Sequence, residues 1–354
     1  MNMKREAMFY NIIEGANIKN LVRCRLCSHY CIIPQSKEGL CLVRKNIEGK
    51  LYSLNWGKAV SLNLDPIEKK PFFHFKPASK VLSFGTPGCN FRCLNCQNWD
   101  LSQGVREYGK NILDQLEDIL PQKIVEIANK YRADGFAYTY SEPTIFFEYA
   151  YDTIKTAKKD PNCSKKFHTF VSNGYFSKEL VEFIIKEKIL DAIRIDLKFV
   201  EDEKYYKICG GRLKPVLENI EKIYKSGIHI EVINLIIPQE NDEDYQIEKL
   251  SKFIFSLSPE IPLHFSRFFP YYKLSEKIPT PYNTLKKAKK IALENGLKYV
   301  YIGNTDIEGA EDTICPECGE LLIKRNRFYI EKNVFEKSKE PFCPNCNKKI
   351  NIVL

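Results

Sequence analysis

The sequence predicts an α/β protein built on a partial (β/α)6 barrel, with an N-terminal cysteine-rich segment and a C-terminal zinc ribbon. Between residues 81 and 303, short runs of β-branched and aromatic residues alternate with helical runs, which is typical of parallel strands joined by right-handed crossovers. Four closely spaced cysteines precede this pattern, and two CxxC pairs follow it. We therefore expect three domains, covering residues 1–76, 77–308 and 309–354.

The expected strands and helices alternate along the central part of the chain. Strands are expected at residues 81–85, 135–140, 168–172, 192–197, 229–237, 263–268 and 299–303. Helices are expected between them, including residues 123–131, 178–188, 213–226, 245–256 and 284–295. Six strands after the first describe an incomplete barrel, whose open side would admit a large substrate.

Length and charge restrict the class of protein. The chain of 354 residues, 44% of them hydrophobic, suits a core of roughly 200 to 250 residues with small appendages. Its net charge is +9, but the lysines are spread along the whole chain, so we expect no nucleic-acid partner. No apolar run is long enough to span a membrane, and no apolar region follows the charged start. We therefore expect a soluble, cytoplasmic protein with no membrane partner.

Cys89, Cys93 and Cys96 form a CxxxCxxC loop directly after the first expected strand. Three thiolates can hold three irons of a 4Fe-4S cluster and leave one iron open, whereas an electron-transfer cluster takes four thiolates. An open iron suits S-adenosylmethionine, which a reduced cluster cleaves to a 5'-deoxyadenosyl radical. A zinc knuckle or a structural cluster is the alternative for the bare spacing. The position at the carboxyl end of a strand favours catalysis.

The N-terminal cysteines form a second group. Cys24, Cys27, Cys31 and Cys41 fit a closed tetrahedral zinc site, with His29 as a possible substitute ligand, and an auxiliary iron-sulfur cluster is the alternative. We favour zinc from the sequence.

The third group lies near the C-terminus. Its members, at the spacing of a zinc ribbon, are Cys315, Cys318, Cys343 and Cys346. Such a module is too small to fold by its core alone, and it could dock a protein or a nucleic acid. Cys163 and Cys209 lie outside the three groups and are interpreted as packing residues.

Polar residues lie at or just beyond the ends of several expected strands, except that His264 lies within the strand expected at residues 263–268. They are Ser141, Glu142, Ser172, Asn173, Asp196, Lys198 and His264. Taken singly, Glu142 is typical of a helix cap, Asp196 with Lys198 of a salt bridge, and His264 of a hydrogen-bonded core histidine. Their shared position next to the cluster loop makes them candidate cofactor-binding residues.

In combination, these motifs resemble the AmmeMemoRadiSam system radical SAM enzymes, which are relatives of pyruvate formate-lyase activating enzyme. The resemblance covers about residues 20 to 305. Besides the motifs above, it rests on residues 71–75, 97–99, 236–241, 265–268 and 301–304. It implies the 4Fe-4S cluster on the three loop cysteines, and a methionine-binding role for Glu142 and its neighbour Ser141. It also places Ser172, Asn173 and Asp196 near the cosubstrate. Asn95 departs from the family pattern, which has an aromatic residue there that packs against adenine.

The leading hypothesis is a radical SAM enzyme that abstracts hydrogen from an unknown substrate. A glycyl-radical enzyme activase is one alternative, and a non-catalytic zinc or iron-sulfur binding protein is another, supported by basic residues at 324–327 in the ribbon. No G-x-G-x-x-G fingerprint is present, so an external ferredoxin or flavodoxin is expected as the electron donor. A protein substrate is a further expected partner, with other members of the AmmeMemoRadiSam system among the candidates.

Overall fold

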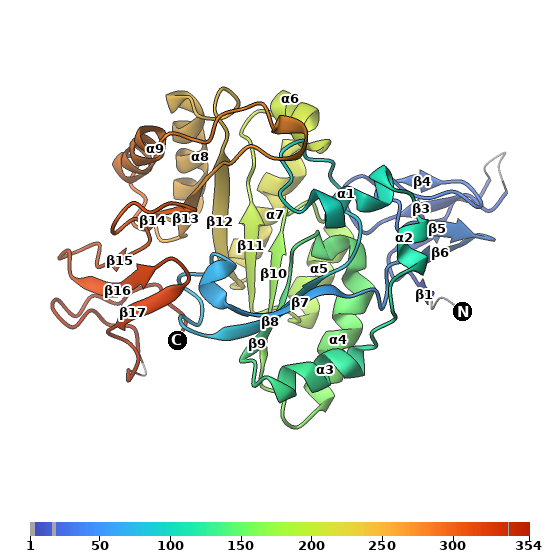
Figure 1. The fold of residues 1–354 in the computed structure, drawn as a ribbon, viewed down its shortest axis with the longest axis horizontal. Helices are drawn as coiled ribbons and strands as arrows, with labels where there is room; N and C mark the ends of the chain where they lie inside the picture. The colour runs from blue at the N-terminus through green and yellow to red at the C-terminus, as the bar shows by residue number, and fades with distance from the viewer. Residues whose placement is uncertain (1–3, 16–18, 339) are drawn as a thin grey trace.

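A computed structural model describes residues 4–15, 19–338 and 340–354, and its centre is a curved eight-stranded sheet (Figure 1). Its parallel strands pair in chain order: β8 (Lys80–Gly85), β9 (Gly135–Tyr138), β10 (Phe167–Ser172), β11 (Ala192–Asp196), β12 (His229–Ile236), β13 (Leu263–Arg267) and β14 (Val300–Gly303). β7 (Val60–Pro66) pairs antiparallel with β8 and forms one edge, and β14 forms the other. The sheet is an open, barrel-like one. The predicted strands are confirmed to within two residues, whereas β7 was not predicted.

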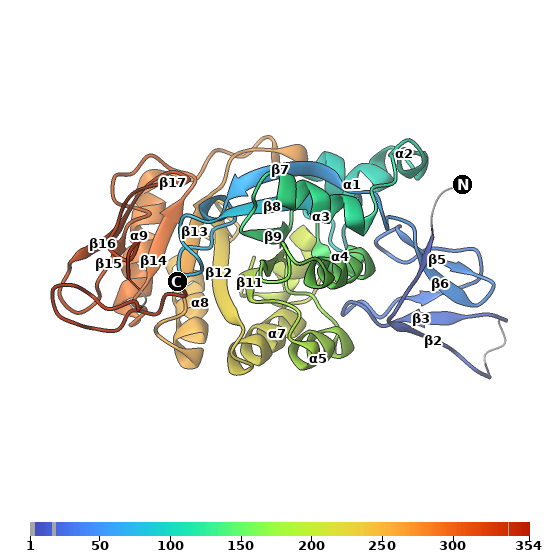
Figure 2. The ribbon, with the colours of Figure 1, turned by 90° about the horizontal axis from the view of Figure 1, so that it is seen from below.

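Each crossover between successive parallel strands contains a helix on the outside of the sheet. These helices are α3 (Pro121–Lys130), α4 (Phe147–Lys159), α5 (Lys178–Glu187), α7 (Leu213–Lys225), α8 (Asp244–Leu257) and α9 (Tyr282–Glu294). Figure 2 shows α4, α5, α7 and α8 along one side of the sheet. In α7, Val216, Ile220 and Ile223 are buried at helical spacing, which is why this helix packs on the strands. No described helix is both long and apolar enough to cross a membrane.

Shorter helices surround the cysteine loop. α1 (Trp99–Glu107) and α2 (Asn111–Asp114) follow the loop, while α6 (Asp202–Lys204) runs into the π-helical turn η3 (Tyr205–Cys209) after β11. The sequence did not predict η3.

The N-terminal segment forms two small antiparallel sheets. One contains β1 (Arg5–Glu6), β6 (Lys50–Ser53) and β5 (Arg44–Ile47), and the other contains β2 (Tyr10–Ile12), β3 (Val22–Cys24) and β4 (Ile32–Ile33). Both lie at the end of the molecule remote from β14 (Figures 1 and 2). Arg44 forms a buried ion pair with Glu148 of α4, and Ser177 Oγ donates a hydrogen bond of 2.7 Å to the Arg25 carbonyl. These contacts hold the N-terminal sheets against the barrel.

The C-terminal segment forms a third small sheet at the opposite end of the molecule (Figure 1). Its strands are β15 (Thr313–Ile314), β16 (Leu321–Asn326) and β17 (Tyr329–Asn333). The Arg325 side chain is buried and donates a hydrogen bond of 2.8 Å to the Phe73 carbonyl. Phe75 also bridges to Val353 in parallel. The segment around Phe73 therefore links the C-terminal sheet to the barrel.

Glu231 on β12 holds that linking segment in place from inside the barrel. Its buried carboxylate accepts hydrogen bonds from the Phe73 and His74 backbone N–H groups at 3.0 and 2.8 Å. It also pairs with His229 and His264 at 3.1 and 2.7 Å. Burial raises the pKa of Glu231, but the hydrogen bonds from His229 and His264 outweigh burial and hold that pKa well below its ordinary value. The carboxylate is therefore ionised, and each of its two oxygens has two hydrogen-bond partners.

We expect Glu231→Ala to lower the free energy of unfolding by about 3 kcal/mol, because removing one partner of a buried ionic network leaves the others unpaired. Thermal denaturation at pH 7 would measure the loss. Glu308→Ala, at an exposed position, is the control and should change the melting temperature little. An unchanged melting temperature for Glu231→Ala would contradict the structural role.

Candidate functional site

The three-cysteine loop leaves β8 at its carboxyl end and is held there by η3. The Arg92 N–H donates to the Cys209 carbonyl at 2.9 Å, and the Leu94 N–H donates to the Ile208 carbonyl at 3.0 Å. The Phe91 N–H points at Cys89 Sγ, 3.3 Å away, so a backbone dipole already faces one thiol of the loop. Hydrogen bonds to ligand sulfurs are among the features that set the potential of an iron-sulfur cluster.

Two glycines allow η3 to approach the loop this closely. A Cβ atom on Gly211 would lie 2.3 Å from the Phe91 ring, and one on Gly210 would lie 2.8 Å from the Arg92 side chain. Gly210 also has φ +75°, which L side chains rarely adopt. Gly210 ends η3 in the left-handed conformation, so the pair forms a turn and also lets η3 approach the loop.

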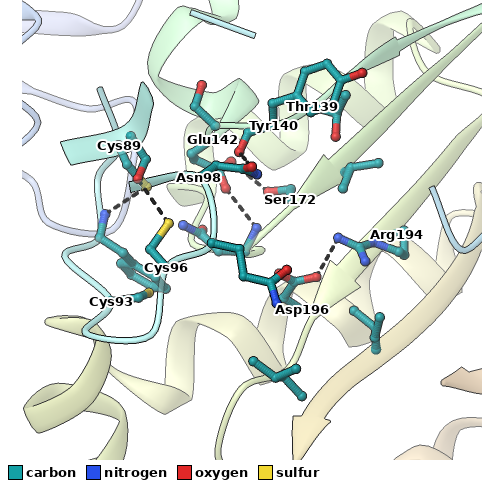
Figure 3. Close-up of a pocket in the computed structure, with 18 of the residues that line it drawn as sticks. Cys89, Cys93, Cys96, Asn98, Thr139, Tyr140, Glu142, Ser172, Arg194 and Asp196 are labelled. Atoms are coloured by element: carbon teal, nitrogen blue, oxygen red, sulfur yellow. Dashed lines mark hydrogen bonds and ion pairs between the residues drawn. The ribbon is translucent and has the colours of Figure 1, made fainter. Parts of the chain in front are cut away.

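A cavity of about 420 Å³ opens between the cysteine loop and the carboxyl ends of the strands (Figure 3). Its wall includes the three loop cysteines and six of the seven predicted cofactor-binding residues: Ser141, Glu142, Ser172, Asn173, Asp196 and Lys198. Parallel pairing brings these residues together, because every strand from β8 to β13 ends at the same edge of the sheet. The structure thus places them around one space, and their cofactor-binding role stays a prediction.

Glu142 connects the ends of β9 and β10. It is buried, and its carboxylate accepts hydrogen bonds from Thr144 N–H and O–H at 3.0 and 2.6 Å, from Ser172 O–H at 2.7 Å and from Asn173 N–H at 2.8 Å. Burial raises the pKa of Glu142, and these donors oppose the rise. Glu142 therefore caps the short helix η2 (Pro143–Phe146) and also lines the cavity, so the two sequence interpretations are compatible.

Asp196 lies between two cations at the end of β11. Its carboxylate is 2.7 Å from Arg194 and 2.9 Å from Lys198. Burial raises the pKa of Asp196, but the two cations outweigh burial and lower it. Burial lowers the pKa of Lys198, but the charges of Asp196 and Cys93 outweigh burial and raise this pKa well above its ordinary value. The sequence analysis missed Arg194, although the two-residue strand period that pairs Asp196 with Lys198 also places Arg194 on that face.

A further polar wall comes from the end of β7 and the segment that follows it. Asp65 accepts hydrogen bonds from Lys69, Lys70 and Tyr140. Burial raises the pKa of Asp65, but these donors outweigh burial and lower it. Burial lowers the pKa of Lys70 to about 8 despite the pairing with Asp65. Lys69 and Lys70 line the cavity, and nothing in the sequence pattern had indicated them.

Two residues lie where the sequence did not predict them. His264 does not line the cavity, because it is two residues below Ser266 on β13, roughly 7 Å deeper in the barrel, and faces Glu231. The predicted cofactor contact for His264 therefore has no support in the geometry. Cys209 lies next to the loop, because its carbonyl accepts the Arg92 N–H at 2.9 Å, and its thiol lowers the pKa of Cys93.

The two four-cysteine groups differ in sulfur spacing. In the C-terminal group, the Cys315–Cys346 and Cys318–Cys343 sulfur pairs are each 3.6 Å apart, and all four sulfurs lie within 4.8 Å of one another. Four sulfurs at about 2.3 Å from one tetrahedral zinc ion would be about 3.8 Å apart, so this group can hold a single metal ion.

The N-terminal group is wider. Its four cysteines line one small cavity together with His29, but no three of these described sulfurs lie within 4.8 Å of one another.

The three cysteines and the strand-end polar groups surround one cavity at the carboxyl ends of parallel strands, where α/β barrel enzymes place their active sites. Residues 84–250 match the radical SAM superfamily. The chain is 44% identical over 354 residues to the uncharacterized protein MJ0808 of Methanocaldococcus jannaschii, covering 99% of this chain and 100% of that one. The chain therefore contains a radical SAM superfamily domain and is an S-adenosylmethionine-dependent enzyme. The alternative of a non-catalytic binding protein is not supported.

Other matches are more distant. The pyruvate formate-lyase 1-activating enzyme of Escherichia coli is 23% identical over 243 residues, which cover 64% of this chain and 93% of that one. The putative glycyl-radical enzyme activating enzyme MJ1227 of Methanocaldococcus jannaschii is 25% identical over 211 residues, which cover 58% and 81%. The crystal structure of a radical SAM methyltransferase from Sphaerobacter thermophilus aligns with TM-score 0.47 and 13% identity, over 68% of this chain and 70% of that one.

We expect Gly211→Ala to cost about 1 to 3 kcal/mol, because the new methyl group overlaps the Phe91 ring and must push the cysteine loop away from η3. Iron bound per chain after anaerobic reconstitution should fall with it. Gly303→Ala is the matched control, since its new Cβ would meet only Glu311 at 3.6 Å. Equal iron loading in both variants would show that η3 does not position the loop.

Proposed function

We propose that the protein binds a 4Fe-4S cluster through Cys89, Cys93 and Cys96 and uses S-adenosylmethionine to abstract hydrogen from a substrate. The observation that carries this proposal is the cavity that the three cysteines share with Glu142, Asp196 and their neighbours. When bound, a cluster with one iron free of protein ligands supplies the electron that cleaves S-adenosylmethionine to methionine and a 5'-deoxyadenosyl radical.

The polar residues of the cavity fit such a cosubstrate. Glu142 Oε2 accepts only the Asn173 N–H among the described contacts, so it keeps room to accept a hydrogen bond from an ammonium group. Asn95 Oδ1 is buried in the cavity wall without a hydrogen-bond partner, and it offers an acceptor at the position where the family pattern has an aromatic residue. Arg194 and Lys198 hold positive charge beside Asp196 and can orient an anionic group.

Membership in the AmmeMemoRadiSam subfamily and the substrate form the finer part of the proposal. Similarity to enzymes named as activating enzymes of pyruvate formate-lyase favours a second candidate, activation of a glycyl-radical enzyme. In that case the substrate is a protein segment, and a ferredoxin or flavodoxin supplies the electron. The appearance of a glycyl-radical paramagnetic signal on a partner protein, dependent on S-adenosylmethionine, would distinguish the activase from an enzyme of small molecules.

The accessory parts complete the proposal. The C-terminal cysteines hold zinc, which their spacing supports. A nucleic-acid role for the ribbon has less support, because Arg325 is buried and Lys324 pairs with Glu331 at 2.9 Å. Of the three domains assigned from the sequence, the first is better ended before β7, because β7 pairs with the central sheet.

Cys93→Ala should reduce formation of 5'-deoxyadenosine to the background of cluster-free protein, because one iron loses its ligand. The assay reconstitutes the protein anaerobically, reduces it with dithionite and separates the products of S-adenosylmethionine by chromatography. Cys163→Ala is the control. Cys163 is far from the loop in the sequence, contacts Asn129 in a buried position and does not line the cavity. Equal product from wild type and Cys93→Ala, or none from a wild type with a verified 4Fe-4S cluster, would reject the proposed function.

We expect Asp196→Asn to weaken S-adenosylmethionine binding about tenfold, or about 1.4 kcal/mol, because Arg194 and Lys198 lose the charge that positions them. Equilibrium dialysis of the reconstituted protein would measure the affinity. The exposed substitution Glu336→Gln is the control. An affinity equal to that of wild type would remove Asp196 from the binding site.

A further inference from the structure

The N-terminal cysteines surround a single space. Cys24 ends β3, Cys27 and Cys31 flank the turn before β4, and Cys41 lies in the loop before β5. All four line the same cavity, which measures about 10 Å³, roughly the room of one water-sized sphere.

Sulfur spacing separates this group from the C-terminal one. The ribbon sulfurs stand at the separation that a single tetrahedral ion imposes, whereas no three of the N-terminal sulfurs approach within 4.8 Å of one another. A cubane cluster places a different iron under each thiolate, so its ligand sulfurs stand farther apart than those on one ion. The same chain therefore holds one four-cysteine group at the spacing of an ion and another at a wider spacing.

Two residues that line this cavity each carry a buried hydrogen-bond donor without a partner among the described atoms. They are Arg44 Nε and Asn90 Nδ2, and both residues line the cavity. The other nitrogens of Arg44 bind Glu148, and Asn90 Oδ1 accepts from Asn173 Nδ2 at 2.8 Å, so each side chain is fixed with one donor free. An unsatisfied buried donor costs about 1 to 3 kcal/mol. Sulfur atoms of an anionic metal centre would accept these donors, and Arg44 would offset part of its negative charge.

The N-terminal group also touches the catalytic cysteine loop. The Asn90 carbonyl is 2.8 Å from His29 Nε2, between Cys27 and Cys31 in the chain, and Asn90 directly follows Cys89. A Cβ atom on Gly88 would lie 3.3 Å from the Cys41 carbonyl. Cys31 is half-buried, whereas Cys27 is buried deeper in the protein. The N-terminal centre therefore lies between the surface and the loop.

We propose that Cys24, Cys27, Cys31 and Cys41 hold an iron-sulfur cluster of the 4Fe-4S type, and that this cluster passes electrons to the catalytic loop through the contact at Asn90. A one-electron donor protein of the ferredoxin or flavodoxin class reduces the N-terminal cluster by one electron. That electron moves to the cluster on Cys89, Cys93 and Cys96, and the N-terminal cluster returns to its oxidised state without transfer of a proton or a group. The relay rests on the proposed function, whereas the identity of the N-terminal centre does not.

The first experiment identifies the metal in the absence of the catalytic cluster. The full chain carrying Cys89→Ala, Cys93→Ala and Cys96→Ala is reconstituted anaerobically, and iron, sulfide and zinc are counted per chain. We expect about four irons and four sulfides, one zinc in the ribbon, and a paramagnetic signal after reduction that S-adenosylmethionine does not alter. Two zinc ions and no iron would overturn the proposal. This result is independent of any S-adenosylmethionine cleavage.

A second set of variants guards against misfolding. Cys31→Ser, the smallest change to the group, should lower the iron content of the triple variant while its ribbon zinc stays at one per chain. Cys163→Ser is the matched control and should leave both metals unchanged. Iron content unaffected by Cys31→Ser would show that the iron is bound elsewhere and would overturn the assignment.

The relay is tested by the choice of reductant. In the variant with Cys24→Ala and Cys27→Ala, 5'-deoxyadenosine formation should fall at least tenfold with reduced flavodoxin, yet stay near the wild-type rate with dithionite. Equal rates with flavodoxin in the variant and the wild type would overturn the relay. If wild type with a verified catalytic cluster forms no product with either reductant, the proposed function fails, while the metal count still decides the N-terminal centre.

Discussion

Parallel pairing of seven strands in chain order is the constraint on which the rest of the molecule depends. It brings all their carboxyl ends to one edge, so the loops after β8, β9, β10 and β11 must meet there. Residues that are about a hundred positions apart, such as Cys89 and Lys198, therefore face the same cavity. The open edges at β7 and β14 leave the sheet incomplete, and the two accessory segments lie at opposite ends of it (Figure 1).

Buried carboxylates then fix the parts to one another. A buried carboxylate is costly unless hydrogen bonds and counter-charges offset its desolvation. Glu148 pairs with Arg44 and ties the N-terminal sheets to α4, while Glu231 holds the segment that carries the C-terminal sheet. Glu142 satisfies the same requirement at the cavity, and the half-buried Asp196 pairs there with Arg194 and Lys198. Stability and site geometry thus share the same interactions.

The three cysteine groups differ in backbone geometry as well as in cysteine count. In the ribbon, two short turns bring Cys315 and Cys343 with their partners to the separation that one ion needs. In the CxxxCxxC loop, η3 holds the backbone between Cys89 and Cys96 through hydrogen bonds to the Arg92 and Leu94 N–H groups. The N-terminal group has the same number of cysteines as the ribbon, but no three of its described sulfurs lie within 4.8 Å of one another.

Much of the fold and of the site followed from local pattern. Strand and helix periodicity located the parallel strands and five of the crossover helices, because residues that pack on both faces of a sheet must be apolar in continuous runs. The CxxxCxxC spacing and the strand-end positions indicated the loop and six of the cavity residues. Long-range packing decided the rest. Lys70 reaches the cavity because β7 pairs with β8. His264 lies outside the cavity, deeper in the barrel beside Glu231, and the two-residue period of a strand indicates which face a residue occupies but not its depth. The sulfur separation in each cysteine group likewise depends on how distant loops pack, which no spacing in the chain specifies.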